Sequence, residues 1–217
     1  MPAIVYAVSK VKKWPNKRLL GQSNDGYVKL ILRLHNLSAN MARLFFALDI
    51  NSKDKNTIDA WRQANLNLPY KKIPKGNFHI TLVFLGNITN EQRAALTRCA
   101  GRAAKKVQAS GELQLALDQC RWFKRARVLC LANQFTPDWL SFLANELGEQ
   151  AKSLDVFQEI RPYRPHVSLY RKAKHPAPKS VVPNLTLSIS SFSLYQSISV
   201  ETGVIYKPIK RWSLVKK

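Results

Sequence analysis

The sequence predicts an α+β protein built mainly on antiparallel strands. Helix and strand patterns follow one another along the chain, and from residue 166 onward strand patterns prevail, separated by turns rich in proline and serine. The 217 residues are 46% hydrophobic and 22% charged, which is typical of a folded protein and not of a disordered one. A chain of this length can bury its own core, as one domain or as two small lobes.

Each expected element has its own pattern. Strands are expected where apolar and aromatic residues cluster between turn residues, and helices where apolar residues recur three or four positions apart. In chain order we expect a strand at 42–50, a helix at 52–66, a strand at 78–86, a helix at 90–107, strands at 113–119 and 126–132, a helix at 138–154, and strands at 166–170, 185–197 and 210–217. Ser52 should cap the first helix, and Thr89 with Gln92 should form a capping box on the second.

The first 40 residues differ from the rest. They carry seven lysines or arginines and one acid, Asp25, and their apolar residues follow no long period. A buried-strand pattern, ARLFFALDI, begins immediately after Met41. We therefore expect residues 1–40 to be a basic extension, either disordered or not part of the natural protein, and residues 41–217 to form a single domain. A basic arm that contacts RNA is the other interpretation of the extension.

The chain is strongly basic, with 35 lysines or arginines against 13 acids and a net charge of +22. Without residues 1–40, 28 basic and 12 acidic residues remain, and the net charge is still +16. Such an excess attracts polyanions and predicts a nucleic acid or phosphate partner. A generally basic proteome would give the same composition, so charge indicates a class of partner and not a reaction.

The sequence shows no sign of export or membrane insertion. No apolar run approaches the roughly 20 residues that a membrane helix needs. The three cysteines are odd in number and have no CxxC spacing, which is typical of reduced thiols. We expect a cytoplasmic protein.

One local pattern occurs twice. The tetrads HITL at 79–82 and HVSL at 166–169 each read histidine, apolar, hydroxyl, apolar, and each lies in an expected strand. Two of the four histidines of the chain occupy this pattern, 87 positions apart. A single histidine in an apolar strand is more often a hydrogen-bonded core residue than a catalyst. Two copies with a hydroxyl at the same offset favour function.

The pattern suits phosphoryl chemistry. Because alternate side chains of a strand share a face, His79 lies beside Thr81, and His166 lies beside Ser168. If the two strands are neighbours, two imidazoles and two hydroxyls line one site, and the hydroxyls can hydrogen-bond the phosphoryl oxygens. With an unperturbed pKa near 6.5, one imidazole can accept a proton while the other donates one.

A positive charge for the phosphoryl group could come from Arg171, five residues beyond His166. Its odd offset places it on the far face of a regular strand, so it can serve only if the strand ends or twists near Tyr170. No third metal ligand is evident near either histidine, and a zinc site needs about three or four protein ligands. We expect no metal and no cofactor.

These residues resemble the two-histidine phosphoesterases, and within them the bacterial and archaeal RNA 2′,3′-cyclic phosphodiesterases, formerly called 2′-5′ RNA ligases. The hallmark is a pair of H-x-[ST]-x motifs, matched here by HITL and HVSL, with serine at position 168 where threonine is common. The segments RLFFALDI, NFHITLVFLG, FQEIRPYRPHVSLYR, FSLYQS and YKPIKRWSL are similar to that subfamily in the same order. The resemblance covers 41–217 and none of 1–40.

The resemblance implies a bilobal fold, with two mainly antiparallel sheets around a central groove and helices packed outside. It implies metal-independent opening of RNA 2′,3′-cyclic phosphate ends to 2′-phosphates, and reversal of this reaction as a weak 2′-5′ ligation. By the same resemblance His79 would be the proton donor and His166 the proton acceptor. Thr81, Ser168 and Arg171 would hold the phosphate.

Several further residues are candidates for RNA contact. Phe78, Tyr163 and Trp122 could stack on a base or belong to the core. Arg125 and Arg127 could follow phosphates or lie on a solvated hairpin. We expect RNA ends, from tRNA fragments or oligoribonucleotides, as substrate, and a monomer.

Two other functions remain open from the sequence. One is a module that binds nucleotide or RNA in the same groove without turnover. The other is a basic RNA-binding or assembly protein whose histidines are structural, so that His79→Ala would damage folding as much as activity.

Overall fold

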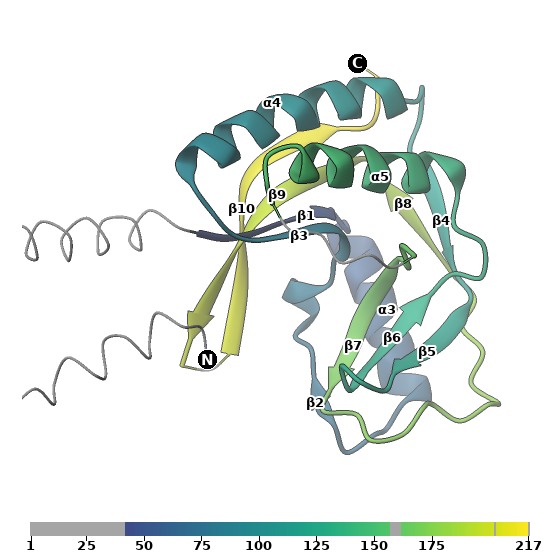
Figure 1. Cartoon of the computed structure of the whole chain (residues 1–217). Helices are drawn as coiled ribbons and strands as arrows, with labels where there is room; N and C mark the ends of the chain where they lie inside the picture. Colours follow the sequence, from purple (N-terminus) through teal and green to yellow (C-terminus); the bar gives the residue numbers. More distant parts are fainter. Residues whose placement is uncertain (1–41, 157–161, 202, 217) are drawn as a thin grey trace, which may run out of the picture. The chain divides into compact units, whose positions relative to one another are not determined.

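The computed structural model describes residues 42–156, 162–201 and 203–216 (Figure 1). Its elements are β1 (Ala42–Leu48), α3 (Ser52–Asn65), β2 (Lys71–Lys72), the 3-10 helix η1 (Lys75–Asn77), β3 (Ile80–Ile88), α4 (Asn90–Val107), β4 (Leu113–Leu117), β5 (Gln119–Phe123), β6 (Val128–Ala132), α5 (Asp138–Lys152), β7 (His166–Arg171), β8 (Leu185–Ile189), β9 (Ser191–Val200) and β10 (Gly203–Ser213). The extension expected at 1–40 lies outside the described residues and stays a prediction.

The α+β class is confirmed, and the strand pairs within both sheets are antiparallel. The larger sheet runs β10-β9-β1-β3-β7-β6-β5, with β2 added beside β7, and β4 pairs with β8 in a second sheet. The strand expected at 185–197 is two strands, because the chain leaves the small sheet after β8 and enters the large one as β9. The unpredicted β5 likewise begins where the chain leaves β4.

The large sheet consists of two halves that meet at β3 and β7. One half contains β10, β9, β1 and β3, and the other contains β7, β6, β5 and β2. Ile80 of β3 pairs with Val167 of β7, and away from this point the two strands diverge (Figure 1). Each half therefore supplies one of the two tetrads.

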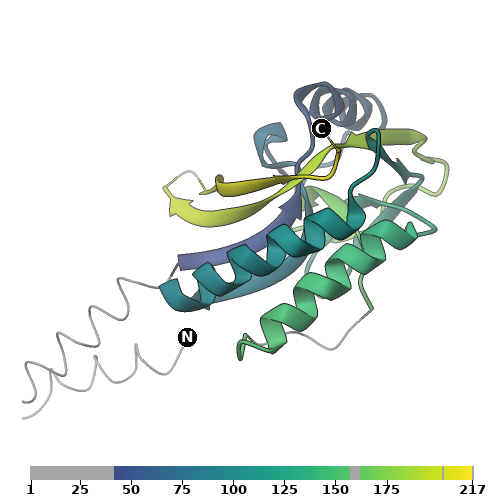
Figure 2. The same ribbon diagram turned by 90° about the horizontal axis from the view of Figure 1, so that it is seen from above.

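The helices lie on the outside of the sheet halves. α4 and α5 run side by side over the half that contains β3 and β10 (Figure 2). The predicted capping box of α4 is present, since Gln92 N donates to Thr89 Oγ1 and Thr89 N donates to Gln92 Oε1. None of the described helices is long and apolar enough to cross a bilayer.

α3 belongs with the β7 half. Its cap is Asn51 and not the expected Ser52, because the Asn51 side chain accepts the hydrogen bond of the Asp54 amide. The buried guanidinium of Arg62 donates to the carbonyl of Leu169 in β7 at 3.1 Å. α3 thus packs behind the strand that carries His166.

Candidate active site

The two tetrads lie on neighbouring strands, as the sequence analysis required. His79 immediately precedes β3, and His166 is the first residue of β7. The Ile80–Val167 pair is antiparallel, so continuing its register by one residue sets His79 across from Ser168 and Thr81 across from His166. Each histidine therefore lies on the side of this pair where the other tetrad has its hydroxyl residue.

Both imidazole rings are oriented in the same way. Nδ1 of His79 contacts the carbonyl of Asn77 at 2.7 Å, and Nδ1 of His166 contacts the carbonyl of Arg164 at 2.8 Å. In both cases the partner lies two residues earlier in the chain. A carbonyl can only accept, so Nδ1 carries the hydrogen and protons are exchanged at Nε2. Nε2 of His79 lies 3.1 Å from Thr81 Oγ1, which confirms that these two side chains share a face.

Aromatic rings surround His79. The centroid of the Phe45 ring lies 5.1 Å from that of His79, and the Tyr206 ring meets it edge-on at 4.9 Å. This burial is the main reason that the pKa of His79 is lowered to about 4, although the Asn77 carbonyl acts in the opposite direction. The charges of His166, Lys55 and Arg171 lower the pKa further. In the free protein His79 is therefore neutral at pH 7.

A local irregularity in β7 brings Arg171 to the face of the histidines. Between Ser168 and Tyr170 the register of β7 against β6 shifts by one residue, which makes Leu169 the extra residue of a β-bulge. Leu169 and Tyr170 are consecutive and both buried, so the alternation of faces restarts. Arg171 then shares the face of His166, and the condition that the sequence set for it is met.

Arg171 connects the two halves of the sheet. Its Nη2 donates to Tyr206 Oη at 3.3 Å, and Tyr206 belongs to β10, at the other edge of the sheet order. The same Tyr206 ring contacts His79. The guanidinium is thus held beside the first tetrad, although it belongs to the strand of the second.

His166 has an aromatic neighbour of its own. The ring of Phe123, the last residue of β5, meets the His166 ring edge-on with centroids 4.9 Å apart. Tyr206 and Phe123 therefore make equivalent edge-on contacts, one with each histidine, from strands at opposite ends of the sheet order. Such contacts restrict the ring orientation of each imidazole.

The base-stacking prediction is wrong for Phe78. Its side chain is 2% exposed and lies under the Arg62 guanidinium, 5.1 Å from the ring centroid, so no face of the ring is open to a base. Tyr163 is half-buried and donates from Oη to the carbonyl of Thr81 at 3.1 Å. Trp122 is also half-buried and donates from Nε1 to the carbonyl of Ala173 at 3.2 Å. Both of these rings pack against the core, and their role as stacking residues stays a prediction.

The turn between β5 and β6 carries two of the arginines considered for RNA contact. Arg125 and Arg127 are exposed there. His175 is also exposed and contributes to neither tetrad. Within the described ranges, no group of three or more histidine, cysteine, aspartate or glutamate side chains is placed to hold a metal ion.

The aromatic residues that pack against His79 were not predicted from the sequence. Phe45 and Phe46 are consecutive in β1, so they lie on opposite faces: Phe46 packs on Phe192 and Trp212 in the core, and Phe45 packs on His79. The aromatic pair in RLFFALDI was the available signal. A strand with an aromatic residue on each face is expected to pack against other side chains on both faces.

Asp49 stabilises this aromatic cluster through a network of polar side-chain contacts that no local sequence pattern predicted. Its carboxylate accepts hydrogen bonds from Ser191 Oγ at 2.6 Å, Ser193 Oγ at 2.9 Å and Tyr195 Oη at 2.6 Å, and it forms an ion pair with Arg211, whose Nε lies 3.0 Å away. The Tyr195 ring stacks on Phe45, with centroids 5.4 Å apart. Burial and the neighbouring carboxylate raise the pKa of Tyr195, which keeps its hydroxyl a donor.

Known proteins are similar to this chain in sequence and in fold. No protein-family model matches the chain. The RNA 2′,3′-cyclic phosphodiesterase of Escherichia coli (strain K12) is 33% identical over 178 residues, which cover 80% of this chain and 97% of that protein. A crystal structure described as a phosphoesterase is 34% identical, with a TM-score of 0.72 and coverage of 81% of this chain and 99% of its own. The structure of E. coli LigT complexed with 3′-AMP is 32% identical, with a TM-score of 0.68 and coverage of 80% and 98%.

The extent of these matches decides the family. The E. coli protein is similar over nearly its whole length, and the solved structures superpose over nearly theirs. The chain therefore belongs to the RNA 2′,3′-cyclic phosphodiesterase family of two-histidine phosphoesterases.

Proposed function

We propose that the protein hydrolyses RNA 2′,3′-cyclic phosphate ends to 2′-phosphate ends, with His79 as the proton donor and His166 as the proton acceptor. The observation that carries this proposal is the antiparallel pairing of Ile80 with Val167, which brings the two tetrads together with each histidine toward the hydroxyl end of the other. An in-line displacement at phosphorus needs one group at the attacking oxygen and one at the leaving oxygen, on opposite sides of the phosphoryl group. Two facing tetrads supply such a pair.

The reaction can be followed bond by bond. His166 accepts a proton from water as the water oxygen bonds to phosphorus, and the bond between phosphorus and the 3′ oxygen breaks. His79 donates its proton to that 3′ oxygen. The products are a 2′-phosphate and a 3′-hydroxyl, and a proton passes from His166 back to His79 before the next turnover. Thr81 and Ser168 hydrogen-bond the non-bridging oxygens, and Arg171 stabilises their charge.

Because the pKa of His79 is low in the free protein, His79 must gain its proton when the substrate binds. The cyclic phosphodiester carries one negative charge, and its binding between the histidines favours the charged form of a neighbouring imidazole. Substrate binding therefore loads His79 with the proton that it later donates. A donor with a low pKa also transfers its proton readily.

A leaving group that needs no proton tests the assignment directly. We would compare an oligoribonucleotide with a normal 2′,3′-cyclic end and one in which sulfur replaces the bridging 3′ oxygen, in the presence of EDTA. With the normal end, the kcat of His79→Ala and of His166→Ala should each be about 10²–10⁴-fold lower than that of the wild type. With the sulfur end, His79→Ala should recover most of its activity, because a thiolate leaves without protonation, whereas His166→Ala should not.

The opposite pattern of rescue would reverse the two roles. If His79→Ala lost as much activity with the sulfur end as with the normal end, His79 would not be the proton donor. Thermal melts of the variants separate catalysis from folding, with His175→Ala as the exposed-histidine control. A folded wild-type protein that binds the RNA end without opening it would favour the non-catalytic binding module.

The remaining expectations are part of the same proposal. The catalytic domain comprises 41–217, which is supported by the match of 97% of the E. coli protein to 80% of this chain. It acts as a monomer in the cytoplasm on the ends of tRNA fragments or oligoribonucleotides, without a metal. Ligation is a weak reversal, in which an RNA 5′-hydroxyl replaces water.

A further inference from the structure

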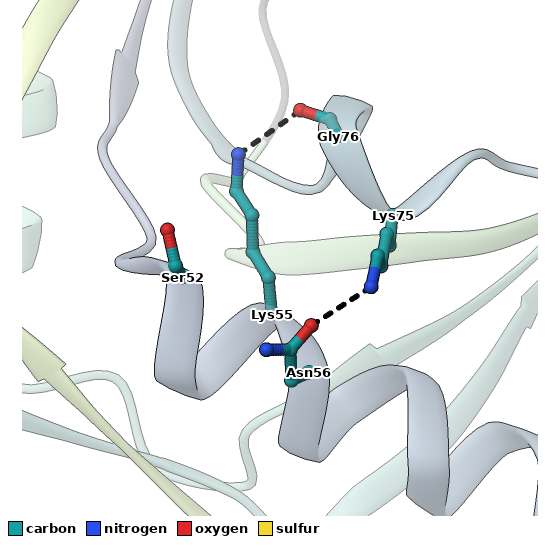
Figure 3. A pocket seen from close by; sticks show the side chains of 5 residues that line it. All are labelled: Ser52, Lys55, Asn56, Lys75 and Gly76. Atoms are coloured by element: carbon teal, nitrogen blue, oxygen red, sulfur yellow. Dashed lines mark hydrogen bonds between the residues drawn. The ribbon is translucent and has the colours of Figure 1, made fainter.

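A basic hollow lies between the start of α3 and η1, the 3-10 helix that ends two residues before His79. It is lined by Ser52, Lys55, Asn56, Lys75 and Gly76 and has a volume of about 270 Å³ (Figure 3). We call it the lysine pocket. Its lining holds two lysines and no carboxylate.

The two lysines approach the pocket from opposite walls. Lys55 of α3 donates from Nζ to the carbonyl of Gly76 in η1 at 3.0 Å, and Lys75 of η1 donates from Nζ to Asn56 Oδ1 in α3 at 3.0 Å (Figure 3). Each ammonium has three N–H donors, so each of these bonds leaves two donors for a ligand. The crossed bonds hold the ammonium groups in place before any ligand arrives.

The carboxylate that acts on Lys55 already has other partners. Asp49 is the carboxylate whose charge reaches Lys55, and four donors from Ser191, Ser193, Tyr195 and Arg211 already surround it. Burial is the largest influence on Lys55 and lowers its pKa, which a bound anion would counteract.

The pocket and the catalytic histidine share one support. Gly76 of η1 holds Lys55, and the next residue, Asn77, holds His79 Nδ1 at 2.7 Å. The charge of Lys55 is close enough to lower the pKa of His79. A ligand in the pocket is therefore a near neighbour of a phosphate held by the tetrads.

We propose that the lysine pocket binds the backbone phosphate of the RNA nucleotide next to the cyclic end. This inference rests on the proposed function. An RNA end brings, besides its cyclic phosphate, one further phosphate for each preceding nucleotide, and the nearest of these follows the reacting group by one nucleotide. A volume of about 270 Å³ is below the roughly 300–1,000 Å³ of pockets that enclose a whole small-molecule ligand, and suits a phosphate with part of its ribose. The site would make the enzyme prefer RNA ends to cyclic mononucleotides.

The test compares two substrates that differ in this phosphate. The first is adenosine 2′,3′-cyclic phosphate, and the second is a dinucleotide with the same cyclic end. For Lys55→Gln/Lys75→Gln, the ratio of kcat/KM between dinucleotide and mononucleotide should fall about tenfold relative to wild type, as expected for the loss of charged hydrogen bonds. Lys53→Gln removes an exposed lysine of α3 that does not line the pocket, and should leave the ratio unchanged.

Two further arms identify the ligand. A dinucleotide whose internal linkage is a neutral methylphosphonate should behave alike with wild type and the double variant. The KM of the normal dinucleotide should also depend less on salt in the double variant, with a log–log slope smaller by about 0.7 for one lost single-strand phosphate contact. An unchanged substrate ratio would overturn the inference. So would a double variant that loses only its inhibition by inorganic phosphate, because the pocket would then bind free anions and not RNA.

Failure of the inference is distinguishable from failure of the proposed function. A wild-type protein that opens neither substrate contradicts the proposed function itself. If the wild-type protein opens both substrates and the double variant has the same ratio of kcat/KM between them, the proposed function stands. The lysine pocket then has no part in RNA recognition.

Discussion

Ile80 and Val167 form the pair that joins β3 to β7 in the described part of the chain, and their register determines the active site. Both side chains are fully buried, so the core fixes which face of each strand points inward. A slip of one residue in either strand would turn its histidine toward the core and its apolar residues toward solvent. The positions of the two histidines therefore depend on the packing of two apolar residues, Ile80 and Val167.

The pH profile of kcat/KM should have its acidic limb near pH 4. This quantity reports the pKa values of the free enzyme, and burial lowers the pKa of His79 to about 4. A pair in which one ring donates and the other accepts is active between its two pKa values, whichever ring has which role. Initial rates between pH 3.5 and 9 with the cyclic mononucleotide would measure the limb. A limb near 6.5, the ordinary value, would contradict the enclosed environment described for His79.

The free energy of unfolding should depend on pH in part through His79. The pKa of His79 is about 4 in the folded state and about 6.5 when unfolded, so between these values the unfolded chain binds more protons. The free energy of unfolding should therefore rise with pH through this window. His79→Gln should reduce the gain between pH 4.5 and 7 by about 2 kcal/mol, less than the full shift because part of the ring reaches solvent.

Urea unfolding at both pH values measures this difference. His175→Gln is the matched control, because His175 is exposed. An equal pH dependence in wild type and His79→Gln would show that the His79 ring is solvated in the folded protein.

Arg171 should matter for catalysis and little for stability. It is exposed, it donates a hydrogen bond to Tyr206, and it would place a cation beside the phosphoryl site that we propose. Arg171→Gln should lower kcat by about 10²-fold, as expected when one stabilising donor is removed, with little change in the melting temperature. Lys174→Gln removes an exposed charge three residues further on and should retain full activity. An Arg171→Gln variant with unchanged kcat would place the guanidinium outside the reaction.

Asp49 should act through structure. Its side chain is 12% exposed, accepts hydrogen bonds from three hydroxyls and pairs with Arg211, so Asp49→Ala leaves the buried Ser193 and the half-buried Ser191 and Tyr195 hydroxyls without this partner. The free energy of unfolding should fall by about 2–4 kcal/mol, measured by urea denaturation. Ser193→Ala removes one donor from the same network and should cost only about 1 kcal/mol. Equal stability of Asp49→Ala and wild type would show that the network contributes no net stabilisation.

Local patterns predicted the elements that depend on neighbours in the chain. The capping box of Thr89 and Gln92 and the shared face of His79 and Thr81 were foreseen, because both follow from spacings of two or three residues. Whether Phe78 stacks on a base or belongs to the core could not be decided from the sequence, for the opposite reason. Its burial depends on Arg62, which belongs to α3 and comes from an earlier part of the sequence.

The sequence by itself determined the α+β class, the duplicated tetrad and the pairing of each histidine with a hydroxyl, since strand alternation is a property of the local backbone. Only the tertiary structure decided that the tetrads face each other, that a bulge at Leu169 turns Arg171 to their side, and that Tyr206 and Phe123 hold the imidazoles. Strand register, bulges and aromatic contacts join residues far apart in the chain. They are fixed by how the buried side chains pack together, and no local periodicity records them.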